Sequence, residues 1–126
     1  MPQALADHTL TNSKVQEGIK MRALTKLIRE DMKPALGVTE PSAIAFSAAK
    51  ARSYTTGPIR KIKTTLNSGM YKNAFTCGIP NSDLVGNAFA AALGAIAGRW
   101  EKRLEVLADV TPEDNAAARQ LVAEQK

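Results

Sequence analysis

Cysteine and histidine are almost missing from this 126-residue sequence, which holds one of each, Cys77 and His8. A single cysteine excludes a disulfide within the chain and any metal site that needs several of its own thiolates. A single histidine in a polar N-terminal segment leaves no basis for a Ser-His-Asp triad or a histidine-ligated zinc. We interpret His8 as a surface side chain and Cys77 as a small residue of a strand.

Aromatic residues and long apolar runs are also scarce. Aromatics make up 5% of the chain, so its core must be built from alanine, leucine, isoleucine and valine. The longest uncharged apolar run, residues 84–98, is shorter than the roughly 20 residues of a membrane-spanning helix. The first residues lack the basic start and apolar stretch of a secretory signal. We therefore expect a cytoplasmic protein with no membrane partner.

Acidic residues are missing between Pro41 and Ser82, and the net charge of the chain is +5. The same stretch carries six basic residues: Lys50, Arg52, Arg60, Lys61, Lys63 and Lys72. A solvated basic face, a site for a small anion or carboxylate, and a nucleic-acid surface are three possible interpretations. Nucleic acid ranks last among these partners, because no aromatic side chains alternate with the charges to stack on bases.

Helical periodicity and capping residues predict five helices. They cover residues 14–33 and 41–52, then begin near residues 84, 100 and 112. We expect Ser82 and Asp83 to cap the third helix, and Thr111 with Pro112 to start the last one. Small residues recur every four positions along the third helix: Gly86, Ala90, Gly94 and Gly98. This stripe predicts close packing against another backbone, with a cofactor groove as the alternative.

A change of period after Pro58 predicts two strands. Ile62, Thr64 and Leu66 alternate with basic and polar residues, as in a half-exposed strand. Residues 67–69 read as a turn, and residues 75–79 alternate again as far as Pro80. The expected fold class is α+β, with about five helices and a small two-stranded antiparallel hairpin, as part of a larger domain. We expect residues 1–12 to be disordered and residues 13–126 to form one incomplete domain.

Three segments together resemble a known family. They read "KPALGVTEP" at residues 33–41, "SGMYKNAFTCGIPNSDLVG" at 68–86 and "NAFAAALGAIAG" at 87–98. In order and spacing they resemble the N-terminal region of the L-cysteine desulfidase family, iron–sulfur lyases similar to the alpha subunit of bacterial L-serine dehydratase. The resemblance covers about residues 32–123. The first segment is the specific one, since alanine-rich helices are common.

The resemblance implies a lyase that removes hydrosulfide or water from a small L-amino acid. It implies a four-iron, four-sulfur cluster as Lewis acid, held by thiolates with one iron open. Carried over by motif, Glu40 is the expected catalytic residue, which would move a proton. Thr39, Lys72, Asn73 and Gly78 are the expected substrate-binding residues.

Two departures from the family pattern limit this activity. Val38 stands where the family has a cysteine, and Asp83 lies in a turn where it would repel a carboxylate substrate. The family's C-terminal region, with the remaining cluster cysteines, is absent, so this chain holds no cofactor and is expected to be inactive alone. The expected partner is a complementary C-terminal chain or a second copy of this chain. The alternative is a non-catalytic assembly or binding module that kept the fold.

Overall fold

The computed structural model describes residues 3–125, with side chains described from residue 15 onward. Contacts divide the chain into two units, Met1–Lys33 and Pro34–Lys126. We call the second unit the compact body. The division expected at residue 13 falls inside the first unit and stays a prediction.

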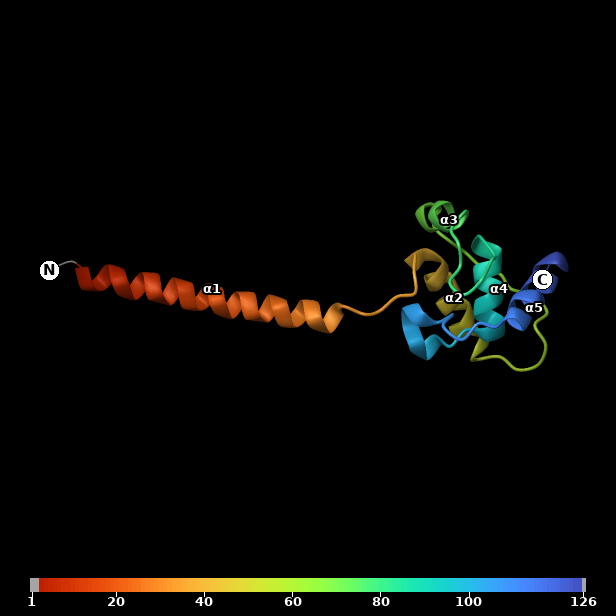
Figure 1. Ribbon diagram of the computed structural model, residues 1–126, viewed down its shortest axis with the longest axis horizontal. Helices are drawn as coiled ribbons and strands as arrows, with labels where there is room; N and C mark the ends of the chain where they lie inside the picture. The colour runs from red at the N-terminus through yellow and green to blue at the C-terminus, as the bar shows by residue number, and fades with distance from the viewer. Residues whose placement is uncertain (1–2, 126) are drawn as a thin grey trace. The chain divides into compact units, whose positions relative to one another are not determined.

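The first unit is one long helix, α1 (Gln3–Asp31), shown at the red end of Figure 1. It begins well before the expected start at Lys14. Its apolar side chains stay exposed, with Ile19 at 61% and Ile28 at 57%. Despite the length of α1, no helix in the described part of the chain is apolar enough over a sufficient length to cross a membrane.

The compact body is built from four α-helices and one 3₁₀ helix: α2 (Thr39–Arg52), α3 (Ser68–Ala74), α4 (Asn87–Ala97), η1 (Trp100–Glu105) and α5 (Pro112–Ala123). Helix α4 packs between α2 and α5, while α3 and η1 contact α2 (Figure 1). The buried core consists of alanines with a few larger aliphatic residues, as expected. Its largest members are Ile44, Ile79, Leu84, Leu93, Val106 and Leu107.

Close packing of α4 is confirmed at Gly94. A Cβ atom built on Gly94 would lie 2.2 Å from the backbone oxygen of Ala45 and 2.6 Å from its Cα. The backbones of α2 and α4 therefore approach too closely for any side chain at this position. This contact accounts for a glycine inside a helix, where it otherwise costs about 1 kcal/mol relative to alanine.

The predicted α+β class and two-stranded hairpin are wrong, because residues 3–125 contain no strand. Asn67, expected in the turn, is instead the N-cap of α3, and its side chain accepts a hydrogen bond from the Met70 amide at 2.8 Å. The expected return strand is thus replaced by the end of α3 and a turn. Residues 58–66 are left as an irregular segment with no strand beside it among residues 3–125.

Two further helix starts in the compact body differ from the predicted positions, and that of α5 agrees. Helix α2 begins at Thr39 with Val38 as its N-cap. Helix α4 begins only at Asn87, because Ser82 Oγ accepts the Leu84 amide at 3.0 Å and closes a turn before the helix. Ser82 and Asp83 are therefore not helix caps. The start of α5 is confirmed, with Thr111 and Asp114 in a reciprocal capping box.

Candidate functional site

The candidate site is centred on Glu40 and Asn73. Glu40 lies half-buried in the first turn of α2, and Asn73 lies exposed near the end of α3. The Asn73 amide Nδ2 donates a hydrogen bond to Glu40 Oε1 at 3.3 Å. The structure therefore brings together two predicted site residues that are 33 positions apart in sequence. The second carboxylate oxygen of Glu40 and the amide oxygen of Asn73 have no hydrogen bond to another described residue.

Two turns approach each other just before α2. A Cβ atom on Gly37, in the loop before α2, would lie 3.9 Å from Pro80 Cγ. Pro80 belongs to a tight turn in which Gly78 forms an antiparallel bridge with Val85, and the Ile79 amide donates to the Leu84 oxygen at 3.3 Å. The segments that carry the sequence motifs therefore converge in the compact body.

The remaining predicted site residues do not contact the Glu40–Asn73 pair through any described polar contact. Thr39 begins α2, and its exposed side chain makes no hydrogen bond to another described residue. Lys72 is exposed on α3 and has no ion pair in the described part of the chain. Gly78 is exposed and contributes its backbone to the turn. The structure therefore brings together only two of the five predicted site residues through a described polar contact.

Thiolate ligands for an iron–sulfur cluster are lacking here. Val38 is apolar and half exposed, and Cys77 is the one cysteine. Cys77 follows α3 in a turn rather than in the expected strand, and its Sγ donates to the Asn73 oxygen at 2.7 Å. No group of three or more Cys, His, Asp or Glu side chains among the described residues could hold a metal ion. The donor set therefore does not fit the cluster that the resemblance implied.

A second polar cluster joins the turn at residues 81–83 to α5 and was missed by the sequence analysis. The amide of Asn115 donates to the Asn81 backbone oxygen at 3.3 Å, and the Ser82 hydroxyl donates to Asn115 Oδ1. Asp83 forms an ion pair with Arg119. Because Arg119 balances its charge, Asp83 is not the free anion that was expected to repel a carboxylate. One sequence signal could have indicated this cluster: two polar residues four positions apart on α5, Asn115 and Arg119.

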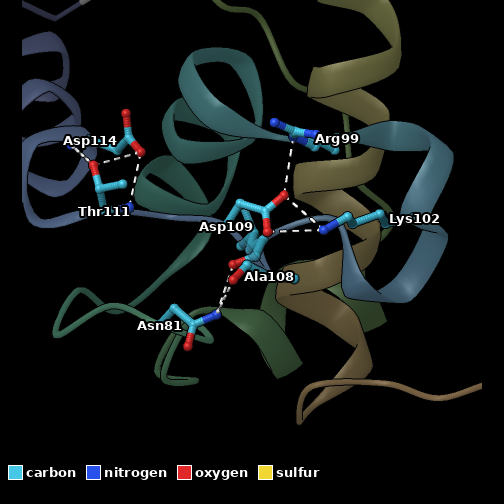
Figure 2. Close-up of polar contacts among 8 residues, drawn as sticks. Asn81, Arg99, Lys102, Ala108, Asp109, Thr111 and Asp114 are labelled. Carbon is cyan, nitrogen blue, oxygen red and sulfur yellow. Dashed lines mark hydrogen bonds and ion pairs between the residues drawn. The ribbon is translucent and has the colours of Figure 1, made fainter.

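Figure 2 shows the polar contacts that fix the connection between η1 and α5. Asn81 Nδ2 donates to the backbone oxygens of Leu107 and Ala108 at 2.9 and 3.2 Å. Asp109 accepts hydrogen bonds from Lys102 Nζ at 2.7 and 2.9 Å and pairs with Arg99 at 3.1 Å. The hydrogen bond from Lys102, with the two positive charges, lowers the pKa of Asp109 below its ordinary 3.8.

Replacing Lys102 with methionine should raise the pKa of Asp109 toward 3.8. Lys102 stabilises the carboxylate form of Asp109. The stability that this contact adds to the folded state is therefore present above the unfolded-state pKa of Asp109, and it is lost as pH falls through the lower folded-state pKa. The measurement is an NMR titration of the Asp109 carboxyl carbon. The neighbouring Arg103→Met variant is the control, and an equal shift in both variants would contradict a specific role for Lys102.

Comparison with known proteins finds relatives named UPF0597 protein. One from Clostridium botulinum (strain Langeland / NCTC 10281 / Type F) is 43% identical over 99 residues, which is 79% of this chain and 23% of the relative. One from Bacteroides thetaiotaomicron is 41% identical over 105 residues, 83% of this chain and 24% of the relative. One from Klebsiella pneumoniae subsp. pneumoniae is 41% identical over 98 residues. No family model and no solved structure matches the chain.

These relatives correct the family assignment made from the motifs. They carry the name UPF0597 protein, not L-cysteine desulfidase, so membership of the desulfidase family is not supported. The chain spans about a quarter of the length of these relatives. Over most of its own length, the chain is therefore similar to one part of the UPF0597 proteins.

Proposed function

We propose that this chain supplies part of an enzyme that acts on a small L-amino acid and that it is inactive without the rest of that enzyme. The observation that carries the proposal is the hydrogen bond between Glu40 and Asn73. It joins a carboxylate and an amide from two separate helices, α2 and α3. Such an arrangement offers fixed polar groups to a ligand of a few atoms.

The charges around the pair favour a zwitterionic ligand. Glu40 is negative and can accept hydrogen bonds from a substrate ammonium group. The amides at the start of α2 and the exposed Lys72 favour a substrate carboxylate. A small amino acid carries both groups on one carbon, so it can satisfy both sides together.

The reaction that we propose is an elimination. Glu40 would take the proton from the α-carbon, the electron pair would form a carbon–carbon double bond, and a small leaving group would depart from the β-carbon with its own pair. Hydrolysis of the resulting enamine gives a 2-oxo acid and ammonium. Glu40 is only half-buried here, and an elimination site must exclude water, so the rest of the enzyme is needed to cover it.

The test combines the full chain with the remainder of the Clostridium botulinum relative, made without its matched 99 residues. We expect the two chains to copurify and to release 2-oxo acid from L-serine or L-cysteine, and neither chain to do so alone. Glu40→Gln should lower kcat by about 100-fold or more, because a general base contributes at least that much. Glu113→Gln, an exposed glutamate at the start of α5, is the matched control.

Three results would contradict the proposal. They are failure of the two chains to copurify, no release of 2-oxo acid from any standard L-amino acid, and full activity of the Glu40→Gln variant. A second candidate function, a non-catalytic assembly module, is favoured by the exposed apolar side chains of α1. For that candidate, the chain would form stable homo-oligomers and the copurified pair would have no activity. Light scattering of the chain alone separates the two, because a monomer excludes self-assembly.

A further inference from the structure

The irregular segment formed by residues 58–66 has no backbone hydrogen bond to any described residue. It runs from the end of α2 past α5 to the start of α3 (Figure 1). Ile62 and Leu66 are half-buried against the core, which anchors the segment at two points. An anchored stretch of this length with open amides and carbonyls has the properties of a sheet edge without its neighbour.

Burial along this segment is confined to its aliphatic residues. Ile62 and Leu66 pack against the core and Ile59 is half-buried, whereas all the polar side chains of residues 60–65 are exposed. The expected hairpin fails because Asn67, placed in its turn, instead caps α3, and residues 75–79, the expected return strand, form a turn. The open backbone of the segment therefore has no partner strand within residues 3–125.

Two hollows flank the segment, and both are open to a partner. One, of about 580 Å³, lies between the segment, α4 and α5, and is lined by Leu66, Ala91, Leu121 and Asn87. Asn87 lines this hollow, and its Oδ1 atom is buried without a hydrogen-bond donor among the described residues. The other, of about 820 Å³, lies between the segment and α2. The two hollows leave room for a further chain beside the unpaired backbone.

The charge of the segment decides which partner fits. Arg60, Lys61 and Lys63 are all exposed, and no acidic residue lies between Pro41 and Ser82. Pairing with the same segment of a second copy would place these like charges opposite one another, which destabilises a ladder. An acidic strand would instead gain complementary pairs along the same edge.

We propose that residues 58–66 are an edge that accepts an extended acidic segment from the remainder of the protein, by β-strand addition. The backbone of the acidic segment pairs with the open amides, and its carboxylates face Arg60, Lys61 and Lys63. The inference rests on the proposed function in one respect, since it takes the missing three quarters of the relatives' length as the source of that segment.

Proline substitution tests strand addition directly. Adjacent amides of a strand point to opposite edges, so only one of Lys63→Pro and Thr64→Pro should remove a ladder hydrogen bond. Both side chains are exposed, so neither change removes core packing. We expect one of the two variants to weaken binding to the Clostridium botulinum remainder about tenfold, and the other to leave it nearly unchanged. If the two proline variants bind equally well, or are weakened equally, the proposal is overturned.

Charge reversal and amide exchange complete the test. Lys63→Glu should weaken binding more than Arg103→Glu, an exposed cation outside the segment. Amides 59–66 should exchange quickly in the free chain and become protected in the assembled pair. Assembly without this protection overturns strand addition and leaves the proposed function standing. Assembly with protection but no 2-oxo acid release overturns the proposed function and leaves strand addition standing.

Discussion

Gly94→Ala is expected to destabilise the compact body more than any other single methyl group added to α4. The new Cβ would lie 2.2 Å from the backbone oxygen of Ala45, and backbone atoms cannot move aside as a flexible side chain can. Helices α2 and α4 would have to separate, which opens the buried cluster around Leu93 and Ile44. We expect the free energy of unfolding to fall by about 3 kcal/mol or more, the upper end for an overpacked core.

A loss of this size is large for the compact body. A unit of about 90 residues has a stability of roughly 5 to 14 kcal/mol, so the melting temperature should drop by roughly 10 to 20 °C. Urea denaturation followed by the fluorescence of Trp100 measures the change. Gly18→Ala in α1 is the matched control, because nothing lies within 4 Å of its new Cβ. If Gly94→Ala is as stable as wild type, the close approach of α2 and α4 is wrong.

Local signals predicted α5 correctly. Thr111, Pro112 and Asp114 lie within one turn, so the cap, the fixed φ of proline and the reciprocal hydrogen bond are all readable in sequence. The four-residue spacing of glycine and alanine along α4 is also a local signal, and it predicted close packing correctly. It did not identify Ala45 as the partner, because that contact depends on how two helices meet.

The hairpin was predicted wrongly because one tripeptide supports two structures. Asn67-Ser68-Gly69 fits a turn between strands, yet asparagine is equally suited to cap a helix. The alternation at residues 61–66 suggested one covered face, yet in the structure only Ile62 and Leu66 are half-buried and Thr64 is exposed, so the pattern did not require a neighbouring strand. A periodic pattern reflects which other chains pack on a segment. Under our proposal, the chain that packs on residues 58–66 lies outside the compact body.

The sequence predicted which residues belong to the candidate site, but it did not predict their contacts. The motifs named Glu40 and Asn73, and the fold joins them through the contact of α2 with α3. The ion pair between Asp83 and Arg119 spans 36 positions, and no local pattern links the two residues. Asp83 was therefore interpreted as a free anion when its charge is balanced.

Gly86→Ala should damage the turn that connects the candidate site to α4. Gly86 has a φ of 98° and a ψ of 173°, a backbone region that is open essentially to glycine alone. A Cβ there would also lie 2.8 Å from the Phe75 backbone oxygen, while the Gly86 amide donates to the Cys77 oxygen at 3.2 Å. Strain and collision act together, so we expect a loss of about 3 kcal/mol in the free energy of unfolding.

Gly57→Ala is the comparison for a positive-φ glycine without a collision. Gly57 also has a positive φ, 79°, but nothing lies within 4 Å of its new Cβ, so only backbone strain of about 1 kcal/mol applies. The difference between the two variants measures the collision with Phe75 together with the greater backbone strain at Gly86. Equal losses would mean that the turn yields freely at Phe75. In that case the Gly78 turn would not hold the end of α3 in place, and the position of Asn73 against Glu40 would need another support.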